Sequence, residues 1–99
     1  MLTPLRRWTE LVSRTVADAL NAELERRGCS MKDAAHEMNT TVQNVSRWAH
    51  PGLAVEPDGD QIDGLMDFLG LDERDMGALV IATKRRRAEM RRSARRRSL

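Results

Sequence analysis

Gln43 and Arg47 are the two side chains whose types and spacing best suit a defined chemistry. They stand four residues apart, so on a helix they lie on the same side. A glutamine amide can make paired hydrogen bonds with adenine, and an arginine guanidinium can do so with guanine. Val42 lies at the edge of this side, where it could contact a thymine methyl group. These residues predict a surface that contacts base edges in the major groove of duplex DNA.

The opposite side of the same helix is apolar. At about 100° per residue, Val45, Trp48 and Ala49 fall together and away from the polar pair. Burial of this side would fix the direction in which the polar side points. Two other interpretations stay open: the polar side is an ordinary solvated face, or Trp48 stacks on a base. We expect Trp48 in the core because it shares the register of Val45.

A preceding helix and a tight turn would position this surface. Ser30 and Asp33 have the spacing of a capping box, which predicts a helix start at Ser30. Asn39 predicts the turn, because asparagine tolerates left-handed backbone better than most residues. The residues of this first helix that we expect to face inward are Ala34, Ala35 and Met38.

The second helix of the pair is expected from Val42 to about His50. Thr40 and Thr41 carry hydroxyl groups that can cap its start. Pro51 ends it, because the residue before a proline disfavours the helical conformation.

An N-terminal helix is predicted by an apolar repeat that ends before Gly28. Thr3 and Pro4 form a good helix entry. The pattern leaves two options open: one helix over residues 4–27, or a short arm before a helix that begins near Thr9. The repeat consists of Leu5, Trp8, Leu11, Val12, Thr15, Val16, Ala19, Leu20 and Leu24.

Two further helices follow a loop over residues 51–60. The fourth ends at Gly70, and Asp72 caps the fifth. No run of β-branched residues alternates with polar ones, so the sequence predicts an all-α fold of five helices. The apolar residues of these two helices are Ile62, Leu65, Met66, Leu69, Met76, Leu79, Val80 and, at the edge, Thr83.

The charge of the chain is unevenly distributed. Residues 84–99 hold nine Lys and Arg and one acid, a net charge of +8, whereas residues 1–83 hold eight basic and fourteen acidic residues, a net charge of −6. A cationic end on an acidic domain indicates an anionic partner. The pattern does not decide whether this end extends the fifth helix or is disordered. The side chains expected to contact DNA phosphates are Lys84, Arg85, Arg86, Arg87, Arg91 and Arg92.

Other partners for this cationic end are RNA, an anionic membrane and the rest of the protein, as a packed helix. A polybasic segment that binds membranes needs an apolar second signal, which this segment lacks. No stretch is apolar enough to span a membrane, and no signal peptide is evident, so we expect a cytoplasmic protein.

Catalytic and metal chemistry are not indicated. Cys29 is the only cysteine, so an intramolecular disulfide is excluded, and no metal-ligand spacing joins it to His36 or His50. The scattered glycines form no phosphate-binding loop. We therefore expect no enzyme, no cofactor and no small-molecule effector.

With these motifs in place, residues 20–52 resemble the lambda-repressor-like helix-turn-helix family, which includes phage repressors and Cro proteins. The family pattern runs from an arginine and glycine lead-in through Ser-Gln, Leu-Ala and Gly-Val-Ser to Ser-x-Trp. This chain has methionine where the family often has a phosphate-binding glutamine, and asparagine in place of the turn glycine. The matching segments are Arg26-Arg27-Gly28-Cys29-Ser30, Ala34-Ala35, Asn39-Thr40-Thr41 and Val45-Ser46-Arg47-Trp48.

The resemblance implies a five-helix lambda-repressor-like domain over residues 1–83 with its motif at 30–50, followed by an arginine-rich extension over 84–99. The helix from Val42 would be the recognition helix. Either Lys32 replaces the phosphate contact that is missing at Met31, or that contact is lost. Base contacts are implied for Thr41, Val42, Gln43, Asn44 and Arg47, and phosphate contacts for Thr40, Ser46 and His50.

The sequence as a whole favours a sequence-specific regulator of transcription that binds double-stranded DNA. A repressor of phage, prophage or mobile-element type fits best, acting as a homodimer or as a monomer that relies on its basic end. Two alternatives stay open. One is a non-specific nucleoid-associated or RNA-binding protein driven by the arginine-rich end, and the other is an antitoxin-like interaction module.

Overall fold

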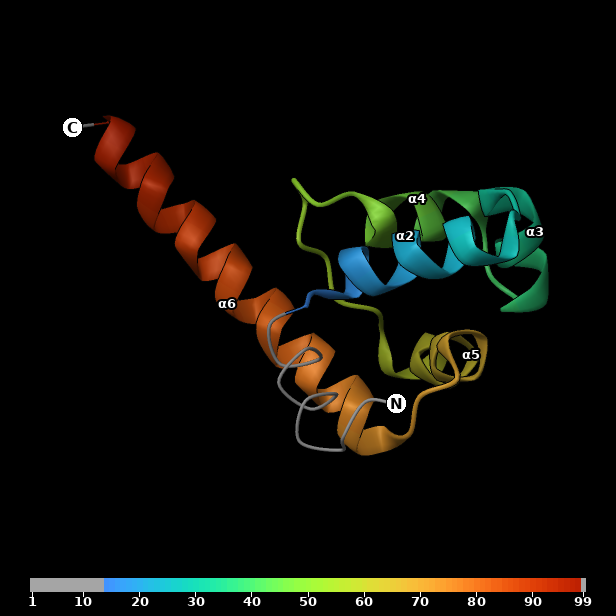
Figure 1. The fold of residues 1–99 in the computed structure, drawn as a ribbon. Helices are drawn as coiled ribbons and strands as arrows, with labels where there is room; N and C mark the ends of the chain where they lie inside the picture. The colour runs from blue at the N-terminus through green and yellow to red at the C-terminus, as the bar shows by residue number, and fades with distance from the viewer. Residues whose placement is uncertain (1–13, 99) are drawn as a thin grey trace.

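The computed structural model describes residues 14–98, and within them it contains five α-helices and no strand. The expected all-α class is confirmed. Helices α2, α3 and α4 lie together, α5 lies beside them, and α6 runs past the group so that its C-terminal half projects from the body (Figure 1). The helices are α2 (Val16–Arg27), α3 (Met31–Glu37), α4 (Val42–Ala49), α5 (Gly59–Leu69) and α6 (Glu73–Ser98).

Helix α2 begins later than either expected start. The Thr15 hydroxyl accepts a hydrogen bond from the Asp18 N–H at 3.2 Å, and the Asp18 carboxylate accepts one from the Thr15 N–H at 3.1 Å. This capping box starts the helix at Val16, so a helix running unbroken from residue 4 or 9 to residue 27 was wrong. The apolar repeat concealed the start because Val16 continues its spacing. The expected entry at Thr3 and Pro4 lies outside the described residues.

The two helices that follow begin where their caps predicted. Ser30 and Asp33 form the capping box of α3, and Asn39 adopts a left-handed backbone with φ of 55°. Thr41 caps α4. Helix α4 ends at Ala49, one residue before the expected end, and His50 is its C-cap.

The core is formed by apolar side chains from all five helices. The expected inward residues of α3 are buried, as are Leu65, Met76 and Leu79. Ile62, Met66, Leu69 and Val80 are only partly buried, whereas Phe68, which the spacing did not single out, is 2% exposed. The central cluster contains Val16, Leu20, Leu24, Ala34, Ala35, Met38, Val45, Trp48, Ala49, Leu65, Phe68, Met76, Ala78 and Leu79.

Helix α6 is fixed to α2 by a buried hydrogen bond. The Thr83 hydroxyl accepts from the Val16 N–H at 2.9 Å and donates to the Leu79 carbonyl at 2.8 Å. A helix's first N–H groups have no partner within the helix, so Thr83 supplies one. Beyond Thr83, α6 continues without a break to Ser98, so the cationic end extends the fifth predicted helix.

Helix α5 approaches the turn after α3 at Gly64. A Cβ atom at this position would lie 2.9 Å from the backbone carbonyl oxygen of Met38. A backbone atom cannot move aside as a flexible side chain can. Glycine at this position therefore allows α5 to pack directly against the end of α3.

Gly64→Ala is expected to lower the free energy of unfolding by about 1–3 kcal/mol, because overpacking forces the two backbones apart. Gly77→Ala is the matched control: it also lies in a helix, nothing lies within 4 Å of its added Cβ, and it should stabilise by up to about 1 kcal/mol. Urea unfolding followed by circular dichroism measures both. Equal effects of the two substitutions would contradict the close approach.

Thr83→Val should cost about 1–3 kcal/mol of stability, because the isosteric side chain leaves the buried Val16 N–H without an acceptor. Thr83→Ser keeps the hydroxyl and should lose only about 0.8 kcal/mol, for one methyl group. The same unfolding experiment compares them. If Thr83→Val were as stable as the parent, the hydrogen bond between Val16 and Thr83 would not contribute to holding α6 in place.

Candidate nucleic-acid interface

Helix α4 buries one side and exposes the other, as its sequence predicts. Val45 is fully buried, and Trp48 and Ala49 are each 4% exposed. Gln43 and Arg47 are exposed on the opposite side, and Val42 is 44% exposed. An open hollow is lined by Val42, Gln43, Ser46 and Arg47. Four of the predicted contact residues therefore form one continuous surface.

Both ends of α4 are held by hydrogen bonds. At the start, the Thr41 hydroxyl accepts from the Asn44 N–H at 3.1 Å. At the end, the Asn21 side-chain amide on α2 donates to the Ala49 carbonyl at 2.6 Å. Asn21 was not singled out from the sequence, because nothing in its local pattern links it to a residue 28 positions away. These bonds fix the direction in which the exposed side of α4 points.

Two of the predicted contact residues are bonded to each other. The Asn44 side-chain amide, which is half-buried, donates to the Thr40 hydroxyl at 3.0 Å. His50 is exposed, and its Nδ1 accepts from the Gly52 N–H at 3.0 Å, which closes the turn after α4. In this structure, therefore, Asn44, Thr40 and His50 stabilise the ends of α4. Lys32 is exposed near the start of α3.

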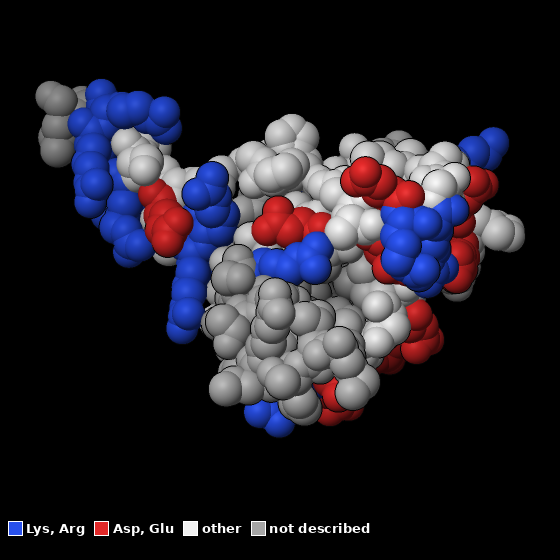
Figure 2. Space-filling view, viewed as in Figure 1, with Lys and Arg blue, Asp and Glu red and all other residues white. Residues whose placement is uncertain are grey.

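The cations of α6 form the largest concentration of one charge on the view in Figure 2, over the projecting half of the helix. Not all of them are unpaired. Glu56, in the loop before α5, lies 2.5 Å from Arg87 and 3.7 Å from Lys84. Arg86 lies 3.8 Å from Glu89. Arg85, Arg91 and Arg92 are exposed.

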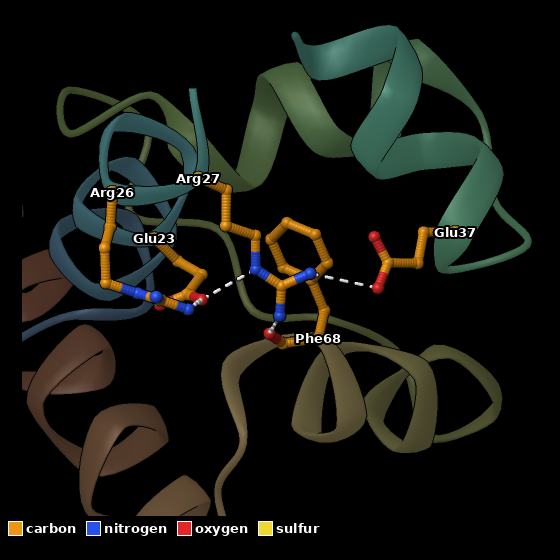
Figure 3. A network of polar contacts seen from close by, with 5 residues as sticks. All are labelled: Glu23, Arg26, Arg27, Glu37 and Phe68. Carbon is orange, nitrogen blue, oxygen red and sulfur yellow. Dashed lines mark hydrogen bonds and ion pairs between the residues drawn. The ribbon is translucent and has the colours of Figure 1, made fainter. Parts of the chain in front are cut away.

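Arg27 links the helices on which α4 rests (Figure 3). From the end of α2 it donates to Glu23 at 2.7 Å, to Glu37 of α3 at 3.0 Å and to the Phe68 carbonyl of α5. Its guanidinium also lies 4.2 Å from the centre of the Phe68 ring, a cation–π distance. The sequence marked Arg27 only as a helix-end residue, because its partners are 10 and 41 positions away.

Glu23 is strongly acidic in this network. Its hydrogen bond from Arg26 contributes most and lowers the pKa of Glu23 to about 2; the bond from Arg27 acts in the same direction, and partial burial opposes both. Glu23 therefore stays ionised and keeps both arginines in place over almost the whole acid range.

Within residues 14–98 no helix is long and apolar enough to cross a bilayer, and no three His, Cys, Asp or Glu side chains are grouped to hold a metal ion. Comparison of the chain with protein-family models, curated proteins and solved structures finds no match.

The network predicts a pH dependence. Because folding lowers the pKa of Glu23, its contribution to stability is complete above the ordinary carboxyl value near 4.5 and is lost as the pH falls towards 2. Glu23→Gln should therefore be less stable than the parent at neutral pH, and the two should converge between pH 4.5 and 2. Urea unfolding over this range measures the difference.

A titration of the Glu23 carboxyl by NMR supplies the control. In Arg26→Gln the largest cause of the shift is absent, so the pKa of Glu23 should move back towards its ordinary value. A pKa that does not change in this variant would assign the shift to another group.

Proposed function

We propose that this protein is a sequence-specific regulator that binds double-stranded DNA, with α3, the turn at Asn39 and α4 acting as a helix-turn-helix of lambda-repressor-like type. The observation that carries this proposal is the exposure of Gln43 and Arg47 together on a short helix whose other side is buried through Val45 and Trp48. Both side chains are of the types that make paired hydrogen bonds to base edges.

The geometry of α4 supports insertion into a major groove. An eight-residue helix has the diameter that the groove admits, and its exposed side contains no acidic residue that would repel phosphates. Val42 adds an apolar contact for a thymine methyl. In such a complex α3 crosses the backbone, where Lys32 reaches a phosphate, and Thr40, Ser46 and His50 lie at the borders of the groove.

The charge of the chain supports the same partner. The net charge of −6 on residues 1–83 opposes the approach of DNA, and the net charge of +8 on residues 84–99 offsets it. We place this regulator among repressors of phage or mobile-element type that act in the bacterial cytoplasm, as a homodimer or as a monomer aided by α6.

Selection of duplexes from a randomised pool on the purified full chain tests the proposal, and we expect a consensus sequence. Arg47→Ala should lose about 1–3 kcal/mol of discrimination at one base position, because a paired contact is removed. Arg47→Lys keeps the charge but not the paired donors, so it should lose discrimination while retaining most non-specific affinity. Uniform loss across all sequences would make Arg47 a phosphate contact.

A second candidate is non-specific binding to nucleic acid, which is favoured by the exposed arginines of the projecting half of α6. Phosphate contacts alone give affinity without sequence preference. In that case the selection yields no consensus, and substitutions at Gln43 and Arg47 change the affinity no more than those of other exposed residues.

A further inference from the structure

Most of the cations of residues 84–97 fall into two groups with different surroundings, and Arg85, which is exposed, belongs to neither. In the inner group, Lys84 and Arg87 contact Glu56, and Arg86 contacts Glu89. The outer group is exposed and forms no ion pair with an acidic side chain among residues 14–97. Four arginines of the outer group are considered further: Arg91, Arg92, Arg95 and Arg96. Lys84 and Arg87 attach α6 to the loop before α5. The outer group remains available to a partner.

The four outer arginines share one side of the helix. Arg91 and Arg95 are four residues apart, as are Arg92 and Arg96, so all four fall within an arc of about 140°. We call this set the arginine stripe. The arginine stripe lies on the side of α6 opposite to the one that carries Leu79 and Thr83, which are buried in the N-terminal half of the helix. Since α6 is continuous from that buried part, the stripe has a fixed direction relative to the body.

Like charges four residues apart destabilise an isolated helix, so the stripe opposes the folding of the segment that carries it. A partner with regularly spaced negative charges removes this repulsion, and the phosphates of a nucleic acid are such a series. An anionic membrane fits less well, because helices that lie on membranes combine cations with large apolar residues. Within residues 88–97, the one uncharged residue on the side of the stripe is Ala88.

We propose that residues 88–97 form a rigid arm whose arginine stripe binds the phosphate backbone of duplex DNA beside the site contacted by α4. This deepens the proposed function and rests on it. Pro51, just past the end of α4, and Arg85 of α6 line the same hollow, so the arm leaves the body on the flank where α4 ends. Ten residues beyond Arg87 reach about 15 Å. That length covers about four base pairs at 3.4 Å each.

The test compares two charge-matched pairs on opposite sides of α6. Arg92→Gln with Arg96→Gln removes half of the stripe, and Arg86→Gln with Arg97→Gln removes the same charge from the other side. On a duplex that carries the selected sequence, the first pair should reduce the slope of log affinity against log salt by about 2, for two lost phosphate contacts. Arg86→Gln with Arg97→Gln should reduce this slope by clearly less. Hydroxyl-radical footprints should shorten on one flank only in the first pair.

The outcomes separate the arm from the proposed function. Equal salt slopes for the two pairs of substitutions would overturn the proposed arm, because a diffuse cationic segment has no preferred side. A consensus sequence from the selection would still support the proposed function. The same measurement on a duplex of unrelated sequence keeps the arm testable without a consensus: a difference between the pairs there supports backbone binding by the stripe. The parent chain and the stripe variant should also be compared on duplex RNA and on anionic vesicles. The proposal would be overturned if the parent chain bound either of these more tightly than DNA and the stripe variant lost that preference.

Discussion

The burial of one side of α4 is the constraint on which the candidate interface depends. An eight-residue helix is too short to be stable alone in water, so its existence and its direction both come from the helices beneath it. Val45 and Trp48 supply the apolar contact. Rotation of α4 about its axis would bury Gln43 and Arg47, and burial of an unpaired guanidinium is strongly unfavourable. The same contacts therefore stabilise the helix and select the side that it exposes.

Helix α2 connects this constraint to the rest of the molecule. Its first N–H is held by Thr83 of α6, and Asn21 in its middle holds the end of α4. At its last residue, Arg27 contacts α3 and α5. A single twelve-residue helix thus sets the positions of α3, α4 and α6 relative to one another. The exposed side of α4 and the cations of α6 are consequently parts of one rigid arrangement.

The sequence predicted the features that local interactions determine, and missed those that depend on distant partners. The caps at Ser30, Thr41 and Gly28 lie within a few residues of the groups they bond, so their spacing was sufficient. The late start of α2 was also local, but the Thr15 capping box was hidden within an apolar repeat. Phe68 was missed because a periodic pattern defines a side of a helix, whereas the packing of its neighbours decides which residue is central.

For the candidate site, the exposure of Val42, Gln43 and Arg47 followed from the register of α4 with its apolar residues. The pairing of Glu56 with Lys84 and Arg87 did not follow, because a loop carboxylate carries no sign of which cation it will meet 28 or 31 residues later. Composition treated the cations of residues 84–99 as one group. The structure separates Lys84 and Arg87, which attach α6 to the body, from the arginines of its projecting half.

The helical state of the projecting residues has an energetic basis that composition alone could not decide. Arginine favours helix, and cations near a helix C-terminus interact favourably with the helix dipole, whereas repulsion between neighbouring arginines opposes both effects. Nucleation, the most costly step of helix formation, is already complete in α6, because Met76, Leu79 and Thr83 are buried. Each further residue needs only propagation. A pre-formed helix also loses less conformational entropy on binding than a disordered segment does, so its charges are available at a lower cost of ordering.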